Sequence, residues 1–107
     1  MRRPWTGLIA VAALACSDAA GTQTAAERGE SIYRNACITC HAQDPTQNGV
    51  LGPPVAGASA ALLEAKLVHG EYPPGYEPKR ATHQMPRLAH LKDYGGDLAA
   101  YLDSVKR

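Results

Sequence analysis

The sequence predicts an all-α domain in which short helices are joined by long loops. Apolar residues recur at helical spacing in three segments, residues 25–36, 58–70 and 93–107. No other segment alternates apolar and polar residues as a half-buried strand would. All prolines except Pro4 lie in the two stretches between these segments, residues 43–57 and 71–87. Loops of this length in a small domain indicate that the chain wraps around a bound group.

Length and charge narrow the classes of protein to which the chain can belong. With 107 residues it makes at most one domain, and its formal net charge of +1 is too small for a nucleic-acid binder or a polybasic membrane arm. The chain has no phenylalanine, one tryptophan and five tyrosines, so aromatic side chains supply little of the core. A domain this small usually needs a disulfide, a metal or a cofactor to offset the entropy lost on folding.

The first sixteen residues predict an export signal. Arg2 and Arg3 precede an apolar run that is too short for a comfortable membrane span, and the residues "ALA" end this run before Cys16. The segment resembles bacterial lipoprotein signals, in which such a cysteine is lipidated, so a lipid anchor on Cys16 and simple secretion both stay open. Residues 17–24 are small and polar and predict a flexible tether. We therefore expect residues 25–107 to lie in the periplasm, soluble or anchored to a membrane.

The first two helices are expected over residues 25–36 and within residues 58–70. The apolar stripe of the first consists of Ala25, Gly29, Ile32, Tyr33 and Ala36, with charged residues between them. The second contains a run of good helix formers, Leu62, Leu63, Ala65, Lys66 and Leu67. Gly70 follows this run as a stop signal.

The third helix is expected over residues 93–107, with Asp93 as its N-cap. Its apolar stripe consists of Tyr94, Leu98, Tyr101, Leu102 and Val105. Gly95 and Gly96 weaken the first turn of this helix, by about 1 kcal/mol each relative to alanine.

A cysteine motif directly follows the first helix. Within "NACITCH", Cys37 and Cys40 are one helical turn apart, and His41 follows at once. The pattern C-x-x-C-H is the attachment signature of c-type haem, in which the two thiols bond to the vinyl groups of the porphyrin and the histidine binds the iron. We therefore predict one haem c, held by thioether bonds at Cys37 and Cys40, with His41 as the proximal ligand.

Three other kinds of site use paired cysteines, and each lacks something here. A thioredoxin-like dithiol would follow a strand in a βαβ pattern, which is absent. A structural zinc site needs two more ligands at close spacing, whereas His69, His83 and His90 are scattered. A disulfide is permissible in an exported protein, but it leaves the adjacent His41 unexplained.

With this motif in place, residues 25–107 resemble the class I c-type cytochromes, which are small all-α proteins folded around one haem. The first helix of that family is similar to "GESIYRNACITCH", and its closing helix is similar to "DLAAYL". The resemblance implies that Gly29 lies where these two helices pack, with Tyr101 nearby. A further family segment is similar to "LGPPVAG", which implies that the Pro53 carbonyl accepts a hydrogen bond from the proximal histidine.

The resemblance also implies a methionine as the second iron ligand. The stretch "HQMPRL" supplies Met85, and Met1 belongs to the predicted signal. A His/Met pair raises the reduction potential of a haem. His83 is the rival ligand, which would give a bis-histidine site of lower potential and leave Met85 as a core filler. His69 and His90 are interpreted as partly exposed residues without a role at the iron.

Two filled iron positions leave no open site for oxygen or substrate, which predicts a one-electron carrier between exported redox proteins rather than an enzyme. Two alternatives stay open: an electron-accepting subunit of an exported dehydrogenase, and a haem enzyme or gas sensor with a vacant sixth position. The basic residues around Met85 have no acid between them and predict either a docking patch or a solvated face: Lys79, Arg80, Arg87 and Lys92. Tyr72 and Tyr76 either bind the haem propionates or simply pack.

Overall fold

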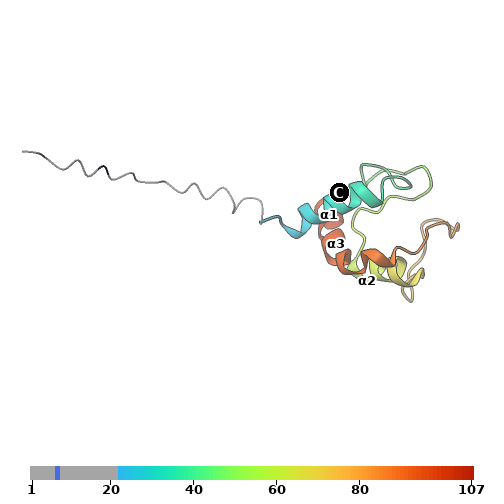
Figure 1. Cartoon of the computed structure of the whole chain (residues 1–107). Coiled ribbons are helices and arrows are strands. Elements are labelled where there is room, and N and C mark those ends of the chain that lie inside the picture. The colour runs from blue at the N-terminus through green and yellow to red at the C-terminus, as the bar shows by residue number, and fades with distance from the viewer. Residues whose placement is uncertain (1–6, 8–21) are drawn as a thin grey trace, which may run out of the picture.

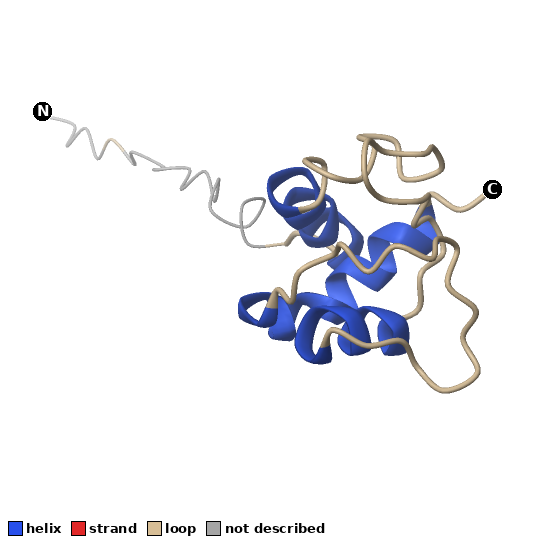
Figure 2. Ribbon diagram, turned by 90° about the vertical axis from the view of Figure 1, so that its right-hand side faces the viewer, coloured by secondary structure: helices blue, strands red, loops and turns tan. Residues whose placement is uncertain are grey.

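A computed structural model of the chain describes residue 7 and residues 22–107. Cys16, the predicted export signal apart from Gly7, and most of the predicted tether therefore lie outside the described residues. Within the described part the structure contains helices and loops and no strand, as Figure 2 shows. The all-α prediction is thus confirmed for these residues. None of their helices has the length and hydropathy needed to span a membrane.

Helix α1 spans Ala25–Ala36 and confirms the first predicted helix. It begins with a capping box, in which the Thr24 hydroxyl accepts a hydrogen bond from the Glu27 amide at 3.1 Å and the Glu27 carboxylate accepts one from the Thr24 amide. The turn that follows stays helical in its hydrogen bonding, because the Cys37 amide donates to the Tyr33 carbonyl at 2.9 Å. The cysteine motif is therefore a direct continuation of α1.

The second predicted helix forms as two joined pieces. Helix α2 spans Ala60–Glu64, capped by the Ser59 hydroxyl, and the π-helix η1 continues it over Ala65–His69. Gly70 ends η1 in the left-handed conformation, with φ of 66°, as its stop signal predicts. The widened π turn was not predicted, because apolar spacing does not report which carbonyl each amide will bind.

The third predicted helix begins differently from expectation. The 3-10 helix η2 covers Ala89–Tyr94, and helix α3 covers Gly95–Ser104. The prediction of Asp93 as N-cap was wrong, since the cap position is Tyr94 and no side chain caps it. The physical reason is that η2 continues directly into α3, so the chain has no extended residue there from which a capping side chain could act.

Helix α3 packs against both α1 and α2 (Figure 1). At the crossing with α1, Gly29 lies so close to the Asp97 carbonyl and the Tyr101 side chain that a Cβ atom would clash with both. The rings of Tyr33 and Tyr101 meet with their centroids 5.6 Å apart. The contact between Gly29 and Tyr101 that the resemblance implied is therefore present. Around it lies a small core of buried residues, Tyr33, Leu67, Leu91, Leu98, Tyr101 and Leu102.

Candidate functional site

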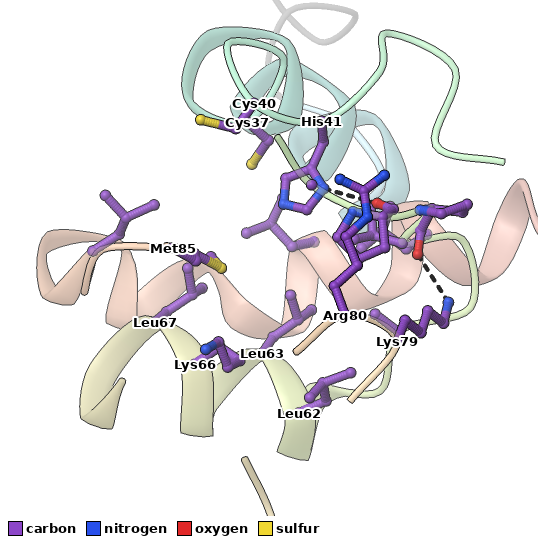
Figure 3. A pocket seen from close by; sticks show the side chains of 18 of the residues that line it. Cys37, Cys40, His41, Leu62, Leu63, Lys66, Leu67, Lys79, Arg80 and Met85 are labelled. Carbon is purple, nitrogen blue, oxygen red and sulfur yellow. Dashed lines mark hydrogen bonds between the residues drawn. The ribbon is translucent and has the colours of Figure 1, made fainter. Parts of the chain in front are cut away.

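The described residues enclose a cavity of about 440 Å³. Its walls come from the end of α1 and the cysteine motif, the loop of residues 51–59, the α2–η1 helix, the loop of residues 72–88 and the α3 residues Leu98 and Leu102. Most of the lining is aliphatic, and Figure 3 shows the side chains around the open space. Protein interiors normally contain few voids larger than a water molecule, whereas ligand sites have volumes in this range. The cavity therefore has the size and character of a binding site for a largely apolar molecule.

His41 lies in the turn after α1, and its side chain lines the cavity. Its Nδ1 atom lies 2.9 Å from the carbonyl oxygen of Pro53. A carbonyl oxygen can only accept, so Nδ1 carries the hydrogen of this bond and Nε2 is the ring nitrogen left to bind a metal. Gly52 lies directly against the ring, where a Cβ atom would collide with it. The loop thus fixes the His41 ring with Nε2 available as a ligand.

Cys37 and Cys40 line the same cavity and are free, half-buried thiols. Burial, together with the neighbouring Cys40, raises the pKa of the Cys37 thiol to about 11. Cys37 is therefore a protonated thiol at neutral pH, without the lowered pKa that activates a thioredoxin-like nucleophile. The carbonyl of Cys40 accepts hydrogen bonds from the amides of Leu51 and Gly52, at 3.1 and 2.9 Å. These bonds hold the Pro53 loop against the motif.

Met85 reaches the cavity from the opposite side. It packs against the core, and in Figure 3 its sulfur and the His41 ring point into the cavity from different walls. After Met85 the chain is anchored by the Leu88 amide, which donates to the Leu67 carbonyl at 2.9 Å. Before Met85, Arg80 donates to the Leu51 carbonyl at 2.8 Å. The loop is therefore fixed on both sides of the methionine.

The structure separates the rival ligand from the cavity. His83 is exposed and absent from the cavity lining, and its ring meets the Tyr72 ring edge-on, with centroids 6.1 Å apart. His69 and His90 are exposed and also lie outside the lining. Of the candidate second ligands, the structure brings only Met85 to the cavity that holds His41 and the two thiols.

Several residues of the cavity wall were not predicted to lie there. Lys79 and Arg80, interpreted from sequence as part of a docking patch, line the cavity and donate to the 48–54 loop, Lys79 at 2.8 Å to the Pro54 carbonyl. Lys66, interpreted as a helix former, is buried in the wall. Its place between Leu63 and Leu67 in an apolar stripe was the signal that could have identified it.

A zinc site has no further support among the residues that the structure describes. No three His, Cys, Asp or Glu side chains gather there in an arrangement that could hold a metal ion. Comparison of the chain with protein-family models, with curated proteins and with solved structures gave no match. The functional assignment therefore rests on the residues of the cavity.

Proposed function

We propose that this chain is a one-electron carrier with a covalently attached haem c and the fold of a class I c-type cytochrome. One observation carries the proposal. Cys37, Cys40, His41 and Met85 all line a single apolar cavity, although Met85 lies 44 residues beyond His41 in the sequence. Two thiols, an imidazole and a thioether around one cavity are the donor set for covalent attachment and His/Met ligation of a haem.

The residues present fit such a group in several respects. Cys37 and Cys40 would hold it through thioether bonds, and His41 and Met85 would bind its iron. The largely apolar walls suit a porphyrin, while Lys66, Lys79 and Arg80 offer positive charge to its acidic side chains. When bound, haem c supplies an iron that gains or loses one electron. It also supplies the apolar bulk that a domain without phenylalanine lacks.

The chain's own residues determine what this iron can do. The Pro53 carbonyl fixes the tautomer and the orientation of His41 and increases its strength as a donor. The anchored loop holds Met85 at the cavity, where its thioether would fill the second position of the haem iron and exclude small molecules. An iron with two protein ligands has no place for a substrate, which leaves electron transfer as its activity.

We further propose that the protein is exported, with a lipid on Cys16 or as a soluble periplasmic form, and passes electrons to and from larger redox proteins. Lys79, Arg87 and Lys92 are exposed cations that flank Met85 in the sequence. This favours partners with an acidic surface. Constant purification with a catalytic chain would instead indicate a dehydrogenase subunit.

The binding of carbon monoxide to the reduced protein tests the closed site. We expect no rapid binding by the wild type at neutral pH and rapid binding by Met85→Ala, because the variant opens the second position. His83→Ala is the matched control and should behave as the wild type. Rapid binding by the wild type would favour the gas sensor or haem enzyme, and a Met85→Ala variant that binds nothing would remove Met85 from the iron.

A further inference from the structure

Lys66 is a buried lysine on the cavity-lining face of the α2–η1 helix. Only 9% of it is exposed, and it is the one charged side chain classed as buried in the described part of the chain. Figure 3 shows it between Leu63 and Leu67 on the face that borders the cavity. Lysines are almost never this buried unless their charge is paired. Because Lys66 borders the cavity, a molecule that fills the cavity would cover the ammonium group and would have to supply a partner for its charge.

The protein supplies only part of that partner. Lys66 Nζ lies 4.2 Å from the centroid of the Tyr72 ring, and the ammonium group has no hydrogen bond or ion pair with the described residues. Tyr72 is held in turn by Tyr76, whose ring stacks on it with centroids 5.5 Å apart. The face of an aromatic ring attracts a cation but compensates a buried charge less well than a carboxylate does.

The rest of the cavity wall adds further positive charge and no negative charge. Its charged residues are Lys66, Lys79 and Arg80, and no aspartate or glutamate lines it. Lys79 and Arg80 donate to neutral oxygens of residues 48–54, so none of these three positive charges is paired with a carboxylate. An apolar cavity with several cations and no acid fits an apolar occupant that carries acidic groups.

We propose that Lys66 is the internal counter-ion for an acidic group of the molecule that occupies the cavity. This inference rests on the proposed function, in which the occupant is haem c and the acidic group is one of its propionate carboxylates. A cation fixed at this place offsets the carboxylate charge, so it disfavours the more positive ferric state and raises the reduction potential. Lys66 would thus be a positioning residue that also adjusts the potential.

The test uses the purified haem protein and three variants. Lys66→Leu removes the charge and extends the leucine stripe, and Lys66→Arg keeps the charge. Lys92→Leu removes an equal charge from an exposed residue outside the cavity lining. In a fixed redox buffer we expect Lys66→Leu to raise the ferric-to-ferrous ratio on the order of tenfold, which is about 59 mV for a one-electron couple. Lys66→Arg should restore most of this shift, and Lys92→Leu should change the ratio less than about twofold.

The outcomes separate the two proposals. A tenfold shift that arginine restores supports the counter-ion. Equal potentials for Lys66→Leu and Lys92→Leu, in proteins that carry haem, would overturn the counter-ion and leave the electron carrier in place. A wild-type protein that carries no haem would overturn both. Where leucine disturbs folding, Lys66→Gln repeats the comparison with a polar side chain of similar length.

Discussion

The Nδ1 atom of His41 lies 2.9 Å from the carbonyl oxygen of Pro53, and Gly52, the residue before this proline, lies against the same ring. The loop therefore positions the imidazole in two ways, by a hydrogen bond and by close contact. Because the acceptor of the His41 hydrogen bond is a main-chain carbonyl, no substitution of the Pro53 side chain removes it directly. A substitution of Gly52, by contrast, would change the contact between the loop and the His41 ring.

We expect Gly52→Ala to displace the His41 ring or the loop, since a Cβ atom would overlap the ring. The variant should lose about 1–3 kcal/mol of stability by overpacking. Its haem should have a higher reduction potential, because a histidine without its carbonyl partner donates less strongly to ferric iron. Thermal unfolding and redox titration measure the two effects. If both quantities match those of the wild type, the loop does not position His41.

Gly29 should tolerate no side chain, because α1 and α3 meet there with the Asp97 carbonyl against the glycine. We expect Gly29→Ala to cost about 1–3 kcal/mol in the free energy of unfolding. Gly96→Ala is the matched control, since nothing lies within 4 Å of the added Cβ atom and the site is in α3. That variant should gain up to about 1 kcal/mol from helix propensity. Equal stabilities in chemical denaturation would argue against the close helix crossing.

Tyr33 should make the protein sensitive to alkali. Its hydroxyl donates to the Ala42 carbonyl at 2.5 Å, and burial is the main cause of a pKa well above the usual range. The folded state keeps this proton where the unfolded chain begins to lose it, near pH 10, so stability is complete below about pH 10 and falls as the pH rises further.

The variant Tyr33→Phe isolates this contribution. It should cost about 1 kcal/mol at pH 7 through the lost hydrogen bond. Above pH 10 its stability should decline less steeply than that of the wild type, although Tyr101, whose pKa burial also raises, keeps part of the slope. Melting temperatures from pH 7 to 11 give the comparison, and parallel curves would contradict the role of Tyr33.

Arg80 should slow the opening of the methionine loop. Its guanidinium donates to the Leu51 carbonyl and to the Asn48 side chain, at 2.8 and 3.1 Å, and so joins the loop before Met85 to the loop behind His41. We expect Arg80→Met to speed the replacement of Met85 by added imidazole about tenfold, if the two bonds together contribute about 1–2 kcal/mol. Lys92→Met serves as the control for charge. Identical rates in both variants would show that the bonds do not restrain the loop.

The sequence predicted those parts of the fold that depend on local pattern. Neighbouring residues were enough to predict the apolar stripe of α1, the helix stop at Gly70 and the haem-attachment spacing of Cys37 and Cys40. The continuous 3-10 entry into α3 and the π turn of η1 were missed, because tertiary packing decides how each amide pairs. Aspartate is a preferred N-cap residue, which favoured a capping role for Asp93. In the structure Asp93 lies inside η2, so it does not occupy the cap position of α3.

The site was predictable only in part, because several of its contacts join segments that are far apart in the sequence. Cys37 and His41 are marked by their motif, whereas the Pro53 carbonyl was predicted only through the resemblance of "LGPPVAG" to a family segment, since every residue has a main-chain carbonyl. Lys66 and Arg80 looked like ordinary helix and surface residues. Their burial and their partners depend on loops that meet only in the folded chain.

The absorption spectrum of protein exported in a host that attaches c-type haem is the most direct test of a haem iron bound by His41 and Met85. We expect sharp low-spin bands after reduction and, in the oxidised protein, the weak far-red band of methionine-bound ferric iron. Low-spin bands without the far-red band would remove Met85 from the iron. A protein with no haem at all would contradict the account and return Cys37, Cys40 and His41 to a disulfide or a metal site.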